Sequence, residues 1–160
     1  MQKLFFRGAA VSGVVFALLG QASMTRMILS EQVKVADFVG VVHIKAVHPS
    51  PDAGQPEAER KDWFLQRADA SVIETIKGAN VPARLTIQFD NGQGEHPSNI
   101  LYQPDTDYFV FLAMELPNGF STCVQGQYAI HGAAINGWLG SASPVALDVA
   151  QDAVRKLLPR

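Results

Sequence analysis

The pattern of apolar positions predicts a β-strand over Asp107–Met114, and this is the strongest secondary-structure signal in the chain. The segment combines aromatic and β-branched residues and contains no glycine or proline. Turn residues flank it, with Pro104-Asp105 before it and Pro117-Asn118-Gly119 after it. Both faces are apolar, so we expect this strand near the middle of a sheet. The predicted faces are Tyr108, Val110, Leu112 and Met114 on one side, and Phe109, Phe111 and Ala113 on the other.

Further strands are predicted on both sides of this segment. They cover Ala36–Val47, Trp63–Ile76, Val81–Asp90, Phe120–Val124 and an extended continuation over Gly126–Ile135. Gly40 predicts a bulge or a sharp bend within the first of them. The Pro117-Asn118-Gly119 turn predicts a hairpin, and Asn136-Gly137 predicts a second one of type I′. In Trp63–Ile76, four apolar residues are expected on one face: Ala68, Ala70, Val72 and Ile76.

Short helices are predicted at both ends of this strand region, over Met24–Lys34 and Val145–Leu158. Ser143 suits the N-cap of the second helix, and Pro144 suits its first position. Its predicted apolar face consists of Val149, Val154, Leu157 and Leu158. The fold class predicted is therefore mainly β, with a five- to six-stranded antiparallel sheet and short flanking N- and C-terminal helices. Strands that are apolar on both faces favour a curled or closed barrel, as do four glycines, Gly40, Gly126, Gly132 and Gly137.

The N-terminal segment Met1–Ala22 has the pattern of a secretory signal peptide. Lys3 and Arg7 supply positive charge, Gly8–Leu19 supplies an apolar run, and Gly20-Gln21-Ala22 resembles a signal-peptidase site. An uncleaved membrane anchor is the alternative, although the apolar run is shorter than the roughly 20 residues that a span needs. We therefore expect export to the periplasm or beyond the cell, and one folded domain over residues 23–160.

Composition narrows the classes of partner. The formal net charge is -2, from 13 basic and 15 acidic residues. Removing Lys3 and Arg7 with the signal leaves 11 basic against 15 acidic residues, a net charge of -4. Nucleic-acid binding depends on basic residues that neutralise phosphates, so no nucleic-acid partner is expected. The predicted mature chain also has no basic amphipathic helix, so no membrane insertion is expected.

The sequence contains one cysteine, Cys123, so an intramolecular disulfide is excluded. Its place in a strand-like run favours a small buried side chain. An intermolecular disulfide and a reactive thiol are the alternatives. A catalytic cysteine needs a base nearby, which the linear sequence does not reveal.

No catalytic, metal-binding or cofactor-binding residue is predicted. The chain has no HExxH helix, no paired-cysteine spacing and no G-x-S-x-G elbow. The candidates considered are His43, His48, His96, His131, Ser121, Ser141, the acidic pairs Asp105/Asp107 and Glu57/Glu59, and a weak calcium pattern over 90–95. His43 and His48 are an odd number of residues apart on a strand, which predicts opposite faces. The acidic pairs are interpreted as turn-forming and solvating residues.

The order of elements resembles the netrin/TIMP-like family, in the form found in bacterial secreted domains. The resemblance rests on Ala36-Asp37, Gly40, Lys77-Gly78 and Tyr108–Leu112, and it covers about Met24 to Leu158. It implies an OB-type barrel of five strands with flanking helices. In animal tissue inhibitors of metalloproteases, an N-terminal cysteine chelates the protease zinc. This chain has Ser23 at its predicted mature N-terminus, so the resemblance carries over the fold and not that inhibitory mechanism.

Three functions remain open on the sequence. The first is an exported, non-enzymatic binding module for a protein or envelope component, acting through the loops His48–Asp62 and Asn91–Asn99. The second is an envelope hydrolase or metal-dependent enzyme, which requires His96 or His131 to lie close to a carboxylate or to Cys123. The third is a divergent protease inhibitor without the cysteine chelate. The sequence does not indicate an oligomeric state.

Overall fold

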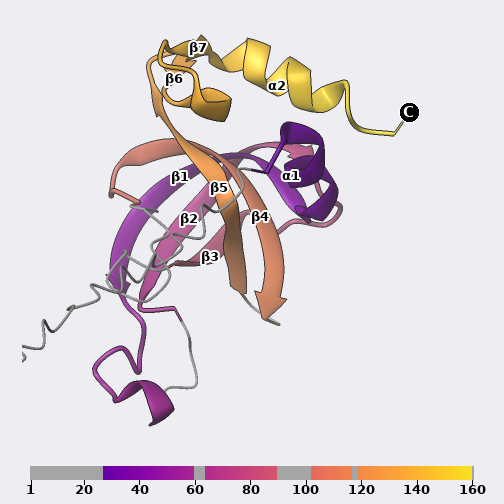
Figure 1. Cartoon of the computed structure of the whole chain (residues 1–160). Coiled ribbons are helices and arrows are strands. Elements are labelled where there is room, and N and C mark those ends of the chain that lie inside the picture. The colour runs from indigo at the N-terminus through magenta and orange to yellow at the C-terminus, as the bar shows by residue number, and fades with distance from the viewer. Residues whose placement is uncertain (1–26, 60–63, 90–101, 117–118, 160) are drawn as a thin grey trace, which may run out of the picture.

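The computed structural model describes residues 27–59, 64–89, 102–116 and 119–159 of the 160-residue chain (Figure 1). The predicted signal peptide therefore lies outside the described residues. The elements in chain order are α1 (Leu29–Val35), β1 (Phe38–Pro49), the 3-10 helix η1 (Glu57–Glu59), β2 (Gln66–Lys77), β3 (Arg84–Phe89), β4 (Thr106–Leu116), β5 (Gly119–His131), β6 (Ala134–Ile135), the 3-10 helix η2 (Trp138–Gly140), β7 (Val145–Ala146) and α2 (Leu147–Arg155).

The described strands form one mainly antiparallel sheet in the order β3-β2-β1-β4-β5-β6-β7. A further parallel pairing joins β3 to β5, at Ile87 with Phe120 and at Gln88 with Ser121. The mainly β class and the central place of β4 are confirmed, because β4 lies between β1 and β5. The sheet has seven strands where five or six were predicted, because two-residue strands extend it beyond β5.

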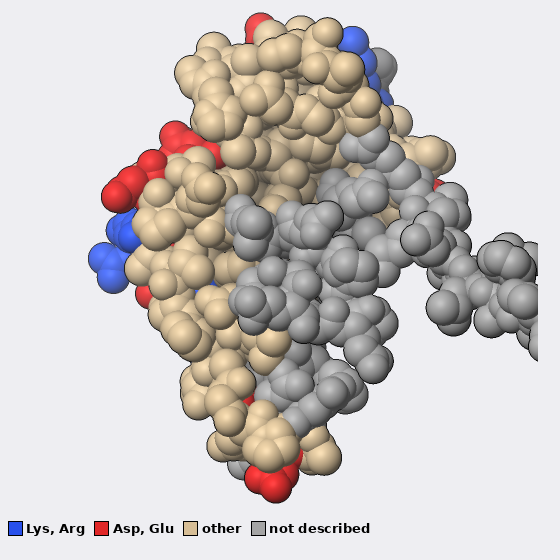
Figure 2. All heavy atoms as spheres, turned by 60° about the vertical axis from the view of Figure 1, so that its left-hand side comes forward, with Lys and Arg blue, Asp and Glu red and all other residues tan. Residues whose placement is uncertain are grey.

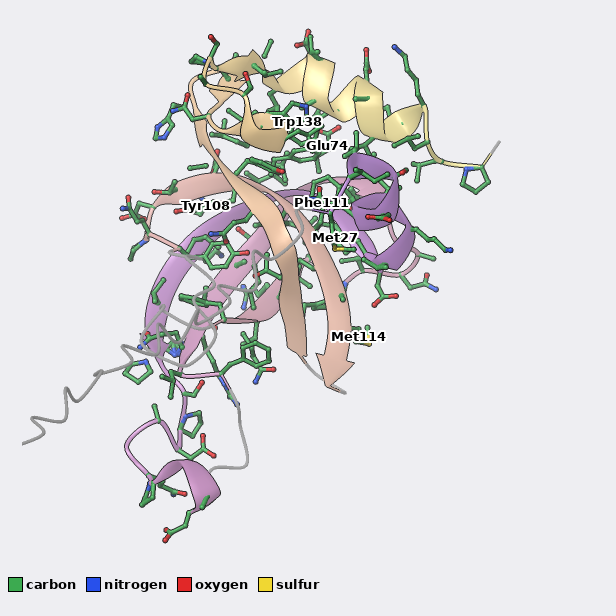
Figure 3. The ribbon with its side chains drawn as sticks, viewed as in Figure 1. Met27, Glu74, Tyr108, Phe111, Met114 and Trp138 are labelled. Atoms are coloured by element: carbon green, nitrogen blue, oxygen red, sulfur yellow. The ribbon has the colours of Figure 1, made fainter. Side chains whose placement is uncertain are left out.

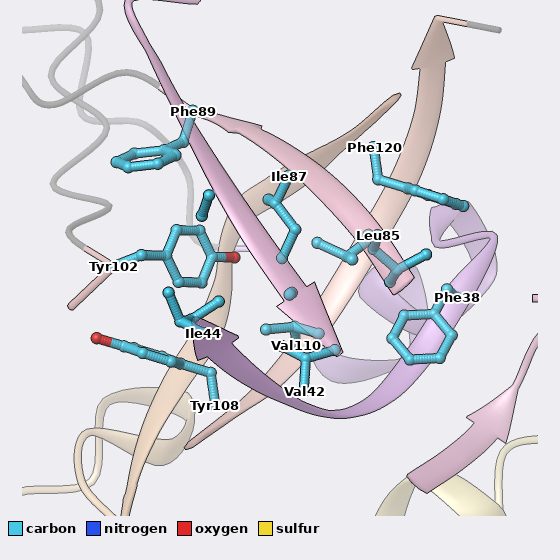
Figure 4. Packing of buried hydrophobic residues seen from close by; sticks show 13 residues of the cluster. Phe38, Val42, Ile44, Leu85, Ile87, Phe89, Tyr102, Tyr108, Val110 and Phe120 are labelled. Atoms are coloured by element: carbon cyan, nitrogen blue, oxygen red, sulfur yellow. The ribbon is translucent and has the colours of Figure 1, made fainter. Parts of the chain in front are cut away.

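Two hydrophobic clusters lie on opposite faces of β4, as its alternation predicted. The first cluster is lined by β1 to β5 (Figure 4) and contains Phe38, Val42, Ile44, Ala68, Ala70, Leu85, Ile87, Phe89, Tyr102, Tyr108, Val110, Leu112 and Phe120. The second cluster lies between the sheet and both helices, and contains Val33, Ala36, Val39, Val41, Phe109, Phe111, Tyr128, Ile135, Trp138, Ala150 and Val154. Met114 is the exception on β4, since 55% of its surface is exposed.

Bulges between β1 and β2 bend these strands. The register shifts between Val39 and Gly40, as the glycine predicted, and again between Val41 and Val42. These shifts change the face that the strand presents. Ala68, Ala70 and Val72 accordingly pack in the first cluster as one face, but Ile76 packs against the second cluster, so its predicted place on that face was wrong.

The predicted loop His48–Asp62 is part of a projecting ribbon. Beyond Ile44, the described pairing of β1 is with β2 alone, and it continues to Pro49. Turns and η1 form the tip of this ribbon, which extends away from the sheet in Figure 1. Residues 60–62 of the predicted loop, and all of the predicted loop Asn91–Asn99, lie outside the described residues.

The hairpin predicted at Asn136-Gly137 was wrong. The chain turns instead at Gly132, with φ of 64°, so that β6 pairs back onto β5. Gly137 also adopts a left-handed conformation, with φ of 70°. It leads into η2, however, where Trp138 is buried in the second cluster. Burying a large aromatic side chain outweighed the local turn preference.

The start of the C-terminal helix also differs from the prediction. Val145–Ala146 form β7 and pair with β6, so α2 begins at Leu147 and Ser143 is not its N-cap. The hydroxyl of Ser141 donates to the Ser143 carbonyl oxygen at 2.8 Å, which makes a local turn. The buried face of α2 is Ala150, Gln151 and Val154, whereas Val149 and Leu157 of the predicted face are exposed.

Polar contacts attach both helices to the C-terminal residues of β2. The Lys77 ammonium donates to the carbonyl oxygens of Val33, at 2.7 Å, and Ala36, at the end of α1. The Glu74 carboxylate accepts from Gln151 and from Arg155 of α2, each at 2.8 Å. These contacts fix the helices over the second cluster. Helix α1 is shorter than predicted and starts at Leu29; residues 24–26 lie outside the described part of the chain.

Candidate functional site: a polar hollow beside β1, β4 and β5

A hollow of about 820 Å³ opens to solvent beside β1, β4 and β5. Tyr108, labelled at the left of Figure 3, marks the side of the sheet on which it lies. The described residues that line it are His43, Gln103, Asp105, Thr106, Asp107, Tyr108, Gln127, Ala129, Ile130, His131 and Gly132. Most of them are polar, and two of them, Asp105 and Asp107, are acidic.

Strand register brings His43 and Asp107 together. They are direct cross-strand partners in the β1–β4 ladder, and the described part of that ladder has no register shift. The Nδ1–H of His43 donates to Oδ1 of Asp107 at 2.8 Å. Both side chains remain partly exposed, by 35% and 44%. The hydrogen bond therefore orients the imidazole and the carboxylate at the mouth of the hollow.

The turn before β4 supplies a second carboxylate. Asp105 has φ of 56°, a left-handed conformation that Asp tolerates better than most residues. Its N–H donates to the Ile44 carbonyl oxygen at 2.8 Å, which ties the turn to β1. The exposed Asp105 carboxylate makes no hydrogen bond or ion pair with the described residues. The predicted turn at Pro104-Asp105 is confirmed, and it holds this carboxylate at the hollow.

Tyr108, which lines the hollow, is the end of a row of packed aromatic rings. Tyr108 packs edge-on against Tyr102, with ring centroids 4.9 Å apart, and Tyr102 packs edge-on against Phe89 at 5.1 Å (Figure 4). The Tyr108 hydroxyl oxygen accepts the N–H of Gln103 at 3.0 Å. Burial raises the pKa of Tyr108 above its ordinary value, and the hydrogen bond from Gln103 opposes that rise.

The raised pKa of Tyr108 predicts a loss of stability at alkaline pH. Because the folded-state pKa lies above the unfolded value of about 10, the contribution is complete below pH 10 and is lost as pH rises above it. The absorbance at 295 nm, titrated for wild type and Tyr108→Phe, should differ by one phenolate with a midpoint above pH 10. Wild type in denaturant is the reference. A midpoint at or below that reference would contradict the burial of the phenol.

Strand β5 forms the opposite wall of the hollow. Ala129 and Ile130 contribute apolar surface, and His131 and Gly132 lie at the exposed end. The side-chain oxygen of Gln127 is shielded from solvent and has no hydrogen-bond partner among the described residues. A buried acceptor that no donor satisfies lowers the stability of the fold by about 1–3 kcal/mol.

The other residues considered from the sequence are not in the described lining of this site. Nε2 of His48 lies 3.4 Å from Oδ2 of Asp69 on β2, and His96 lies outside the described residues. Ser121 and Cys123 are on β5, but their side chains are outside the part of the chain that the structure describes. Within that part, no group of three His, Cys, Asp or Glu residues is placed to hold a metal ion.

From the sequence, His43 and His131 were separate candidates and Asp105/Asp107 were an acidic pair. The fold brings all four residues to one hollow. The enzyme hypothesis required His96 or His131 to lie close to a carboxylate or to Cys123, and His96 and the Cys123 side chain lie outside the described part of the chain. In the described residues, the histidine of the hollow that contacts a carboxylate is His43 instead. No local signal could have found this pair, because its members are 64 residues apart in the chain.

No family model matches the chain, and no curated protein is significantly similar to it. None of the described helices has the length and apolar character needed to cross a membrane.

Proposed function

We propose that the protein is an exported, non-enzymatic binding module on an OB-type barrel, and that the hollow is its binding site. The observation that carries the proposal is the hollow itself, which is open, polar and lined by oriented side chains from three neighbouring strands. Ligand sites in proteins typically combine a concave surface with a few placed polar groups. The partner is a protein segment or another component of the cell envelope.

The strand pairings support the OB-type assignment. Following the described pairs, β1 leads to β2, β3, β5, β4 and back to β1. A ring of five strands with a single parallel pairing is the arrangement expected of a small Greek-key barrel. The resemblance to netrin/TIMP-like domains, carried by Ala36-Asp37 and Lys77-Gly78, points to the same architecture. In such barrels, partners bind along the middle strands and the adjoining loops.

The polar groups of the hollow favour binding over nucleophilic catalysis. Nucleophilic catalysis needs a hydroxyl or thiol within hydrogen-bond reach of a base. Two hydroxyls belong to the described lining: that of Thr106 donates to the Pro104 carbonyl oxygen at 3.2 Å, and that of Tyr108 accepts the N–H of Gln103 at 3.0 Å. His43 donates through Nδ1 to Asp107, which orients the imidazole in the hollow.

The charge of the hollow supports a partner other than nucleic acid. Two carboxylates, Asp105 and Asp107, face the site, and they would repel a phosphate backbone. On the face shown in Figure 2, the blue and red side chains of the described residues lie mainly at the margins. This distribution does not provide the continuous basic stripe that tracks a nucleic-acid backbone.

A hydrolase is the second candidate, and the His43–Asp107 hydrogen bond of 2.8 Å is the observation that favours it. A histidine oriented by a carboxylate is the base component of many hydrolytic sites. This candidate requires a nucleophile or an activated water in the hollow. A panel of ester, amide and phosphoester substrates tests it, with turnover by wild type that His43→Gln abolishes as its required result.

Capture of envelope proteins by the immobilised, purified protein tests the binding function, with two matched variants. Gly132→His places a side chain at the mouth of the hollow, and Gly137→His is its control. Both glycines have positive φ and open space around a β-carbon, so the backbone strain that histidine introduces is matched between the two variants. A component retained by wild type and Gly137→His, but lost by Gly132→His, is the expected result. Equal retention by Gly132→His would place the binding site elsewhere.

A further inference from the structure

The outer edge of the projecting ribbon has no strand beside it in the described part of the chain. Strand β1 pairs with both β2 and β4 as far as Ile44, and over residues 45–49 its described pairing is with β2 alone. The turn at Asp105 ends the β4 side, where its N–H donates to the Ile44 carbonyl oxygen. We call the side of residues 45–49 that faces away from β2 the free edge. Such an edge is a template on which another strand can add.

The hydrogen bonds to β2 show which backbone groups point toward the free edge. Pro49 pairs with Gln66 at the end of the β1–β2 ladder. At the next position, the Ser50 N–H donates to the Leu65 carbonyl oxygen at 3.0 Å. Because hydrogen-bonded and non-hydrogen-bonded pairs alternate, Pro49 and Val47 belong to non-hydrogen-bonded pairs, whose backbone groups point away from β2. Proline has no N–H, so Val47 supplies the one donor of these two positions at the free edge.

A bulge and a lysine in the same segment also hinder an added strand. Between Ile44 and Ala46 the register with β2 shifts, which makes Lys45 the extra residue of a bulge. A bulge bends and twists the strand edge, so a regular second strand fits it poorly. The Lys45 side chain is exposed, and a strand added beside it would have to take its ammonium out of water.

We infer that the free edge of β1 is built to prevent strand addition, whether by a second copy of this chain or by an extended peptide. A bulge, an exposed lysine and a proline are three devices by which sheet proteins protect an edge, and residues 45–49 combine them. The hollow adjoins this edge, because His43 and Asp105 lie where the β1–β4 ladder ends. A partner in the hollow therefore meets side chains and does not continue the ladder along β1. The edge acts in this way whether or not the hollow binds a partner.

Amide hydrogen exchange of the wild-type protein, resolved by residue with NMR, tests whether the edge is free. The N–H of Val47 should exchange at least about tenfold faster than that of His48, which points toward β2. His48 is the matched reference because it is the next residue of the same strand and shares its local opening. Equal protection of the two amides would overturn the inference, since the edge would already be paired or covered.

Restoring the missing donor and removing the charge tests the protective residues. The double variant Lys45→Thr/Pro49→Thr does both with a polar residue that favours strands. We expect it to form dimers or larger species as its concentration rises, while wild type stays monomeric by light scattering after size-exclusion chromatography. The matched control, Pro51→Thr/Lys156→Thr, makes the same two replacements at exposed positions outside β1 and should stay monomeric.

Two results would overturn the role of Lys45 and Pro49. One is a double variant that has the mass of wild type at every concentration, and the other is equal association of the double variant and its control. Slow exchange of the Val47 amide in the associated variant, beside fast exchange in wild type, would place the new contact at the free edge. The exchange measurement on wild type needs no variant, so it tests the edge even where the double variant does not fold.

Discussion

Replacing Gly40 with alanine is expected to destabilise the protein by about 3 kcal/mol or more, the upper range for overpacking a closely packed site. A β-carbon on Gly40 would overlap the backbone carbonyl oxygen of Glu74 on β2 and lie 2.7 Å from Cζ of Phe38. A backbone carbonyl cannot rotate away as the end of a side chain can. The bulge at Gly40 would have to open, which disturbs the β1–β2 ladder and the first cluster together.

Urea unfolding monitored by tryptophan fluorescence measures the effect of Gly40→Ala. Gly54→Ala is the matched control, since a β-carbon at position 54 has no atom within 4 Å. The control should stay within about 0.5 kcal/mol of wild type, as surface substitutions usually do. If Gly40→Ala is insoluble and Gly54→Ala is soluble, that difference also supports the predicted destabilisation. Equal stability of the two variants would show that β1 and β2 do not approach closely at this position.

Replacing Trp138 with alanine is expected to cost about 3–5 kcal/mol, the range for a buried aromatic side chain. Trp138 is 7% exposed and contacts three other rings of the second cluster. Its ring centroid lies 4.9 Å from that of Tyr128 and 5.7 Å from that of Phe109. In Figure 3 it lies with Phe111 in the layer between the sheet and α2. Removing the indole leaves a cavity among η2, β4 and β5, which contribute Trp138, Phe109 and Tyr128.

Thermal unfolding of Trp138→Ala and of the neighbouring Leu139→Ala measures this prediction. Leu139 is 38% exposed and follows Trp138 directly on η2, so it controls for substitution within the same segment. Near-ultraviolet circular dichroism of Trp138→Ala should lose the bands that Trp138 contributes, and any tryptophan signal left belongs to Trp63. Comparable melting temperatures for the two variants would mean that η2 does not contribute to the second cluster. Such a result would favour the hairpin that Asn136-Gly137 predicts locally.

The candidate site lies at the edge of β1 that pairs with β4, where the strand register has no shift. Irregular register is confined to the β1–β2 pairing and to β4–β5, and the described β1–β4 ladder runs without a shift from Phe38 to Ile44. Regular pairing places His43 opposite Asp107 and keeps their side chains within hydrogen-bond distance. The bulges of β1 lie on its edge with β2, where they bend the sheet. The His43–Asp107 pair lies on the opposite edge of β1, where the pairing with β4 is regular.

The sequence by itself determined the strands and the two faces of β4. Side chains alternate along a strand with a period of two, so Tyr108 and Phe109 had to enter different clusters once both faces were buried. The turn at Pro104-Asp105 and the bulge at Gly40 were also predictable, because the conformational preferences of proline and glycine act within a few residues.

Only the tertiary structure decided the hollow and the C-terminal region. The His43–Asp107 contact depends on register between strands far apart in the chain, which no local pattern encodes. The hairpin predicted at Asn136-Gly137 does not form, because burying Trp138 against Tyr128 and Phe109 stabilises the fold more than a two-residue turn would. Helix α2 begins at Leu147 for a related reason: Val145–Ala146 pair with β6, and these backbone hydrogen bonds displaced the Ser143 cap.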